Sequence, residues 1–144
     1  MADFVCELLS NRAQLEAPLP SFGCEAGAIL DFRGIVRDRE DDRLITGIDY
    51  EAHATMAQHQ LERIARESVD RFGLDGAIVR HRVGYVPAGE ASLLVRLAAA
   101  HRAEGLEAMT WLISELKRRV PIWKHARFAE VGAKTSAIAE KIAQ

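Results

Sequence analysis

The chain has 144 residues, of which 49% are hydrophobic and 28% charged, and its formal net charge at pH 7 is -2. This length suffices for one compact domain with a buried core. The slightly acidic balance argues against a broadly basic surface for nucleic acid or acidic membranes. No apolar stretch approaches the length of a membrane span, and the N-terminus lacks the basic and apolar regions of a signal peptide. We therefore expect a single domain over residues 1–144 and a cytoplasmic location.

The first half of the chain predicts three strands, over residues 4–9, 28–37 and 44–51. Between the first two, the prolines and glycines of residues 11–27 predict a loop with one helical turn at most. Gly34 interrupts the second strand and indicates a β-bulge or a close backbone approach. The six consecutive charged residues at 38–43 predict an exposed, mobile loop.

The second half predicts two substantial helices. Apolar residues at helical spacing indicate a helix over residues 55–72, which Gly73 follows as a natural end. A second helix is expected over residues 104–120, because Pro121 forbids continuation. Strands are expected at 77–83 and 92–99, with a connecting loop at 84–90. The Ala- and Lys-rich residues 129–144 predict a short terminal helix. Strand-rich segments with two main helices indicate an α+β fold rather than an alternating one.

Lys117 is the first candidate for chemistry. It lies at the edge of the apolar stripe predicted for the second helix, which comprises Leu106, Met109, Ile113, Leu116 and Val120. An ammonium group held against apolar surface has a lowered pKa, which suits proton transfer or nucleophilic attack. The alternative is a lysine whose charged end simply extends into water.

The cations around Pro121 form a second candidate. Lys124 follows the break at Pro121-Ile122-Trp123, and the neighbouring cationic residues are Arg118, Arg119, His125 and Arg127. A cluster of this kind binds phosphate or carboxylate. A solvated charged face explains the same residues equally well.

Three further cations are weaker candidates. His101 and Arg102 lie between a predicted strand and the second helix, where unpaired backbone N–H groups favour an anion. Arg37 ends a predicted strand, a common place for an ordinary surface arginine. His81 alternates within a strand, and a packing role is expected for it.

The sequence has no glycine-rich phosphate loop and no HExxH or GxSxG motif. Cys6 and Cys24 are expected to be free, partly buried thiols.

Five short motifs, in order, resemble the large catalytic subunit of molybdopterin synthase. They span about residues 27 to 125 and comprise residues 27–37, 50–57, 81–90, 100–102 and 116–124. The resemblance implies an α/β hammerhead-type fold with antiparallel sheets. It also implies a homodimer that carries a small, ubiquitin-like sulfur-carrier subunit at each end, forming a heterotetramer.

The implied activity is that of a sulfurtransferase in molybdenum cofactor biosynthesis. The C-terminal thiocarboxylate of the carrier enters a pocket on the large subunit and supplies sulfur to cyclic pyranopterin monophosphate, which becomes molybdopterin. The resemblance implies no metal and no organic cofactor for this step. The chain has no ubiquitin-like segment or Gly-Gly end, so the carrier is expected to be another polypeptide.

The resemblance also implies roles for individual residues. Lys117 matches the central catalytic lysine beside the carrier's tail, and Lys124 matches a second active-site lysine placed on the substrate. Arg37 matches a substrate-site arginine. His101 and Arg102 match an anion-binding pair that the partner protomer contributes.

The chain departs from the family pattern after Lys124. His125-Ala126 stands where the family usually has a basic residue and then Glu, and the tail from about residue 126 diverges. This departure motivates an alternative, a non-catalytic relative that keeps dimerisation and carrier binding. A third possibility is a generic domain that binds a phosphorylated ligand.

Overall fold

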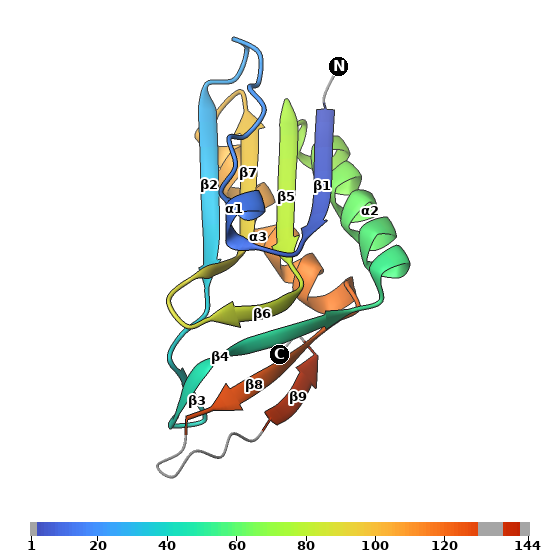
Figure 1. The fold of residues 1–144 in the computed structure, drawn as a ribbon. Coiled ribbons are helices and arrows are strands. Elements are labelled where there is room, and N and C mark those ends of the chain that lie inside the picture. Colours follow the sequence, from blue (N-terminus) through green and yellow to red (C-terminus); the bar gives the residue numbers. More distant parts are fainter. Residues whose placement is uncertain (1–2, 130–136, 142–144) are drawn as a thin grey trace.

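Two sheets meet near the middle of the molecule in the computed structural model, which describes residues 3–129 and 137–141 (Figure 1). The first sheet has the strand order β1 (Asp3–Leu9), β5 (Gly76–Arg82), β7 (Ala91–Ala99) and β2 (Ala28–Ile35). The second has the order β3 (Arg39–Glu40), β4 (Arg43–Ala52), β8 (Ile122–Phe128) and β9 (Ala137–Lys141), and β6 (Gly84–Pro87) also pairs with β4. The predicted α+β class is confirmed. The expectation of antiparallel pairing is wrong for β1 and β5, which run parallel.

Two helices, α2 (Ala54–Phe72) and α3 (Arg102–Arg119), cover one face of the four-stranded sheet. α2 packs on β1 and β5, whereas α3 packs on β2 and β7. The single turn α1 (Arg12–Leu15) contacts β5 and β7, where Leu15 forms a small separate core with Ala91 and Leu94. The main core therefore lies between the sheet and the two long helices, and it continues to the buried Ile45, Ile122 and Phe128 of the second sheet.

Both long helices begin and end close to the predicted positions. α2 starts after His53, whose side chain accepts a hydrogen bond from the Met56 N–H, and it ends at Gly73 with φ 64°.

The predicted apolar stripe of α3 needs one correction. Gly105 is buried against Leu30 of β2, so the next residue, Leu106, is turned into solvent and is 57% exposed. The buried stripe is Gly105, Ala108, Met109, Leu112 and Leu116.

The bulge expected at Gly34 is confirmed, because the register between β2 and β7 shifts between Gly34 and Ile35. The charged run at 38–43 is largely exposed as predicted, but it is not simply a loop. Arg39 pairs with Leu44 and Glu40 with Arg43, which leaves Asp41 and Asp42 as a two-residue turn. Both aspartates have positive φ, 50° and 62°, as a type I′ hairpin turn requires.

Three strands of the second sheet differ from the prediction. Residues 84–87, expected as a loop, form β6, and the segment after Pro121 forms β8 rather than only a turn. The expected terminal helix is wrong where it can be compared, because Ala137–Lys141 is the strand β9 and pairs with β8. The remainder of that prediction, at 130–136 and 142–144, lies outside the described residues.

The tightest approach between strands at the junction involves Gly47 of β4. A Cβ atom at this position would lie 2.5 Å from the Val86 carbonyl oxygen and 2.7 Å from the Tyr85 ring. We predict that Gly47→Ala lowers the free energy of unfolding by about 1–3 kcal/mol, because β6 must move away from β4. Urea unfolding measures this loss. Gly23→Ala is the matched control, since no atom lies within 4 Å of its added Cβ; equal stability of the two variants would contradict the prediction.

Candidate active site

A cavity of about 270 Å³ opens where the two sheets meet the end of α3. Its polar or charged lining residues are Arg37, Tyr50, His81, Ser92, Lys117 and Lys124, and its apolar lining includes Phe32, Leu61, Leu93, Leu116, Val120 and Ile122. The volume is close to the lower limit for small-ligand pockets, so the cavity fits a ring system or a short extended peptide.

Three of the predicted cations, Arg37, Lys117 and Lys124, line this cavity together. Arg37 follows β2, Lys117 lies on the last turn of α3, and Lys124 is on β8. Lys124 is paired across the strands with Tyr50 of β4, and directly opposite residues point to the same face of a sheet. The structure thus brings together side chains from three separate segments of the chain.

No hydrogen bond or ion pair holds any of these three cations within the described part of the chain. Lys117 and Arg37 are exposed and Lys124 is half-buried. Three positive charges around one concave, partly apolar surface, without a counter-charge among the described side chains, favour an anionic ligand. The arrangement supports the prediction of an anion site near Lys124.

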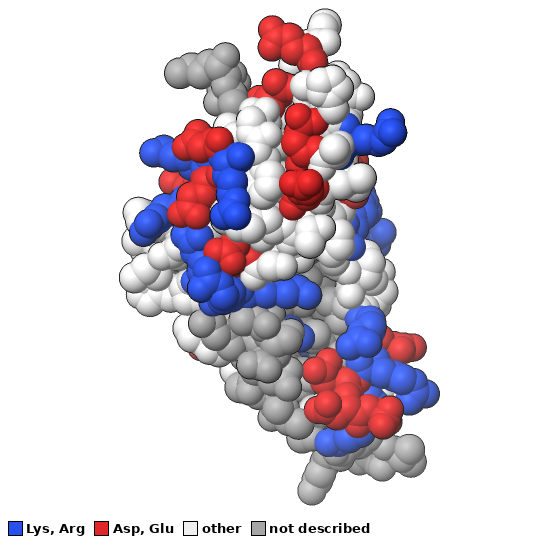
Figure 2. Space-filling view, turned by 180° about the vertical axis from the view of Figure 1, so that it is seen from behind, with Lys and Arg blue, Asp and Glu red and all other residues white. Residues whose placement is uncertain are grey.

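The other cations of the predicted cluster do not belong to this site. Arg119 donates to both oxygens of Glu67 at 2.9 and 3.1 Å, and Arg118 donates to Glu115 at 2.6 Å. Arg127 pairs with Asp49. The hydrogen bonds from these arginines lower the pKa of Glu67 and of Glu115. Figure 2 shows positive and negative side chains intermixed on this side of the molecule. The three arginines are thus engaged in ion pairs and do not line the cavity.

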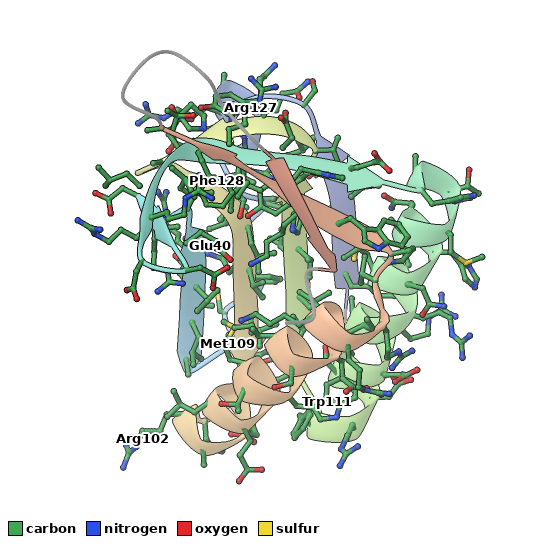
Figure 3. All side chains as sticks on the ribbon, turned by 90° about the horizontal axis from the view of Figure 1, so that it is seen from below. Glu40, Arg102, Met109, Trp111, Arg127 and Phe128 are labelled. Atoms are coloured by element: carbon green, nitrogen blue, oxygen red, sulfur yellow. The ribbon has the colours of Figure 1, made fainter. Side chains whose placement is uncertain are left out.

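His101 and Arg102 lie at the opposite end of the four-stranded sheet. They border a separate, open concavity with Gly27, Ala100 and Ala103. Figure 3 shows Arg102 projecting outward from the start of α3. Leu93 of the cavity and Ala100 are seven residues apart along β7, which corresponds to about 20 Å. Within one chain, therefore, the structure does not bring this pair to Lys117 and Lys124.

The floor of the cavity is polar, a feature that the sequence did not indicate. Tyr50, His81 and Ser92 are all buried and come from β4, β5 and β7. Burial raises the pKa of Tyr50, and the nearby Ser92 side chain offsets only part of this rise. His81 was expected to pack in the core, and its 3% exposure confirms this. The alternation of residues along the predicted strand did not indicate that His81 would line a cavity.

Other candidate groups carry no comparable site. Cys6 and Cys24 are free, as expected, although Cys24 is exposed rather than partly buried. Burial raises the pKa of the Cys6 thiol to about 12, which makes it a poor nucleophile at neutral pH. Residues 3–129 and 137–141 contain no cluster of three His, Cys, Asp or Glu side chains able to hold a metal. None of the described helices has the length and apolar composition needed to cross a membrane.

Comparison with known proteins gives one consistent result. A family model described as MoaE protein matches residues 10–119. The molybdopterin synthase catalytic subunit of Emericella nidulans is 38% identical over 107 residues, which are 74% of this chain and 55% of that protein. The Pyrococcus abyssi protein of the same name is 43% identical over 98 residues, 68% of this chain and 66% of that protein. The matches thus span between half and two thirds of these curated relatives.

Solved structures share the fold. Molybdopterin synthase from Staphylococcus aureus superposes with a TM-score of 0.72 at 24% identity, covering 94% of each chain. A complex of subunits 1 and 2 of the molybdopterin-converting factor from Helicobacter pylori gives a TM-score of 0.68 at 24% identity, covering 92% of this chain and 88% of that one. These likenesses confirm the predicted fold class.

The buried imidazole of His81 gives a prediction about acid stability. Burial lowers the pKa of His81 from 6.5 to about 4. Between these values the unfolded chain binds a proton that the folded chain does not, so stability falls as pH falls. We predict that His81 accounts for a loss of about 2 kcal/mol between pH 6.5 and pH 5.

Urea unfolding of the wild type and of His81→Gln at several pH values isolates this contribution. The difference between the two curves should shrink steadily toward acid pH, because glutamine does not titrate. Parallel curves over this range would show that His81 titrates normally in the folded protein.

Proposed function

The chain belongs to the MoaE protein family, and on this basis we propose that it is the catalytic subunit of a molybdopterin synthase. It transfers sulfur from the C-terminal thiocarboxylate of a small carrier subunit to cyclic pyranopterin monophosphate. The observation that carries this proposal is the cavity, because three cations without a partner among the described residues line it together with apolar side chains. Both reactants are anionic, and one of them is a narrow peptide tail.

Lys117 is the proposed catalytic residue. It stands at the end of α3, beside the apolar side chains of Leu116 and Val120, which we propose as the place of the carrier's Gly-Gly tail. Its ammonium group polarises the thiocarboxylate carbonyl, or it transfers a proton while sulfur attacks and the acyl intermediate is hydrolysed. Lys124 and Arg37 bind the phosphate or the pterin of the substrate, and Lys124 also assists catalysis.

His101 and Arg102 act on the substrate from the partner protomer of a homodimer. The distance of about 20 Å along β7 separates them from the cavity of their own chain. A symmetric dimer that places the start of one α3 next to the cavity of the other protomer removes this separation. The carrier is a separate, ubiquitin-like subunit, and two carriers on one dimer make a heterotetramer. A structural neighbour from Helicobacter pylori is likewise a complex of two subunits.

No metal or organic cofactor enters the proposed reaction, and we place the protein in the cytoplasm. The free Cys6 and Cys24 fit a reducing compartment. We propose one domain over residues 1–144, divergent from about residue 126.

A non-catalytic relative is the second candidate, motivated by His125-Ala126. In β8, residues alternate between faces, so His125 points away from the side of Lys124 and contacts Glu51 at 3.6 Å. The substitution at His125 therefore leaves the lining of the cavity intact, which favours the catalytic proposal. Complementation of a strain that lacks the large subunit distinguishes the two candidates.

The catalytic proposal predicts the behaviour of single variants in a reconstituted assay. The chain is mixed with thiocarboxylated carrier and cyclic pyranopterin monophosphate, and molybdopterin is detected. We expect Lys117→Ala to reduce the rate at least about 100-fold, because the charge that stabilises the reacting carbonyl is lost. Lys124→Ala should cost about 10- to 100-fold, through loss of a charged contact to the substrate.

Arg63→Ala is the matched control for these lysines. Arg63 is an exposed cation on α2 that borders a shallow groove away from the cavity. Its removal changes the net charge equally and should leave the rate unchanged. Normal turnover by Lys117→Ala would refute its catalytic role, provided that both variants unfold at the wild-type temperature.

Mixing two variants that are each impaired tests the contribution of the partner protomer. Lys117→Ala and Arg102→Ala damage the same site from different chains, so a mixed dimer has one intact site and one doubly damaged site. After random exchange of subunits, we expect about a quarter of the wild-type rate, because half of the dimers are mixed. If the mixture is no more active than the separate variants, Lys117 and Arg102 of different protomers do not share a site.

A further inference from the structure

The floor of the cavity contains a buried hydrogen-bond acceptor without a partner. His81 lies on β5 next to the junction, with its ring packed edge-on against Tyr50 at a centroid distance of 5.2 Å. Its Nε2 atom has no hydrogen-bond partner among the described residues and is closed to solvent. His81 nevertheless lines the cavity that Lys117 and Lys124 also line.

The backbone fixes the tautomer of this histidine. Nδ1 lies 2.7 Å from the carbonyl oxygen of Arg82, which can only accept a hydrogen bond. Nδ1 therefore carries the proton, and Nε2 has a free lone pair. Burial lowers the pKa of His81 to about 4, so the ring stays neutral at physiological pH and Nε2 remains an acceptor.

A buried acceptor without a partner is costly, and in native proteins it needs an explanation. The neighbouring Tyr50 does not supply one, because it contacts His81 through its ring and Nε2 has no hydrogen-bond partner among the described residues. The long side chains of Lys117, Lys124 and Arg37 border the same cavity and have no partners that hold them in place within the described residues. Because Nε2 is closed to solvent, a donor on a ligand reaches it only after a side chain of the cavity lining moves aside.

The rim and the floor of the cavity therefore select complementary parts of a ligand. Arg37, Lys117 and Lys124 attract negative charge, and His81 offers one neutral acceptor beside the apolar side chains of the cavity. A ligand that satisfies both has an anionic group and an N–H group a short distance apart. Within the proposed function, on which this inference rests, the pterin N–H groups of the substrate and the amide N–H groups of the carrier's tail have this chemistry.

We propose that His81 is a ligand-binding residue of the active site, whose Nε2 accepts a hydrogen bond from an N–H group of the bound anionic ligand. The hydrogen bond forms only in the occupied cavity. His81 thereby fixes the orientation of the ligand, while the cations at the rim hold its charge.

Steady-state kinetics of two variants test this role. His81→Leu removes the acceptor and should raise KM for the ligand about 3- to 10-fold, the effect of losing one hydrogen bond. His81→Gln retains an acceptor oxygen and should recover part of this loss. Separate titrations assign the source: a KM effect for cyclic pyranopterin monophosphate identifies the pterin, and weaker binding of carboxylate-terminated carrier identifies the tail. A His81→Leu variant with wild-type values for both ligands would overturn the proposal.

Nitrogen NMR of the wild-type chain tests the same contact without depending on how a variant folds. The Nε2 resonance of His81 is assigned through its correlations to the backbone of His81. Adding cyclic pyranopterin monophosphate, or carrier with an ordinary C-terminal carboxylate, should shift this resonance toward that of a hydrogen-bonded nitrogen. An unchanged resonance at saturation with each ligand would overturn the proposal.

The two measurements also separate this inference from the proposed function. If the wild type forms no molybdopterin in the reconstituted assay, the proposed function fails, and the NMR titration alone decides the role of His81. If the wild type is active and the Nε2 resonance does not move, only the inference about His81 fails.

Discussion

The break in the chain at Pro121 is the constraint on which the cavity depends. Proline has no N–H group and disfavours a helical residue before it, so α3 ends at Arg119 and Val120 is extended, with φ -82° and ψ 127°. The chain then continues as β8, whose residues alternate between two faces. Lys117 therefore leaves the last turn of a helix and Lys124 a strand of the second sheet, yet both reach one cavity. A continuous helix would separate them by about 10 Å along its axis.

The three cations of the site differ from Arg118, Arg119 and Arg127 in having no ion pair with a described residue. Arg119 is two residues from Lys117 on α3, but it is held by Glu67 from α2, 52 residues away in sequence. The spacing of apolar residues predicted most of the α3 residues that face the core, because this spacing is a property of the local sequence. It could not predict which cations are neutralised, because that depends on contacts between helices. The resemblance to a known family singled out Lys117 and Lys124, and the structure gives the physical difference between them and Arg119.

The same distinction between local and long-range information explains the accuracy of the fold prediction. α2, α3 and β2 were predicted within a few residues because their apolar patterns extend over several turns or a whole strand. β6 and β9 have only four and five residues and give little pattern to read. β6 and β8 both pair with β4, far away in sequence, as Tyr50 pairs with Gly84 and with Lys124, and such pairing is not visible in a local pattern. Leu106 was misplaced for a related reason. The close approach of α3 to Leu30 at Gly105 rotates the buried stripe, and a glycine gives no apolar signal.

The polar floor shows why sequence patterns alone could not complete the site. In β5 all seven residues are buried, so alternation, which normally separates core from surface, gives no information there. Arg80 and Arg82 on this strand pair with Glu7 and Glu90 at 3.0 and 2.8 Å, although the buried Nε of Arg82 has no partner among the described residues. His81 between them forms no ion pair with a described residue, and its Nε2 also has no partner there. A folded chain tolerates such a group where the loss in stability is offset by binding. The two arginines thus hold the fold together through ion pairs with Glu7 and Glu90, whereas His81 forms no ion pair with a described residue and is the group for which we propose a role in ligand binding.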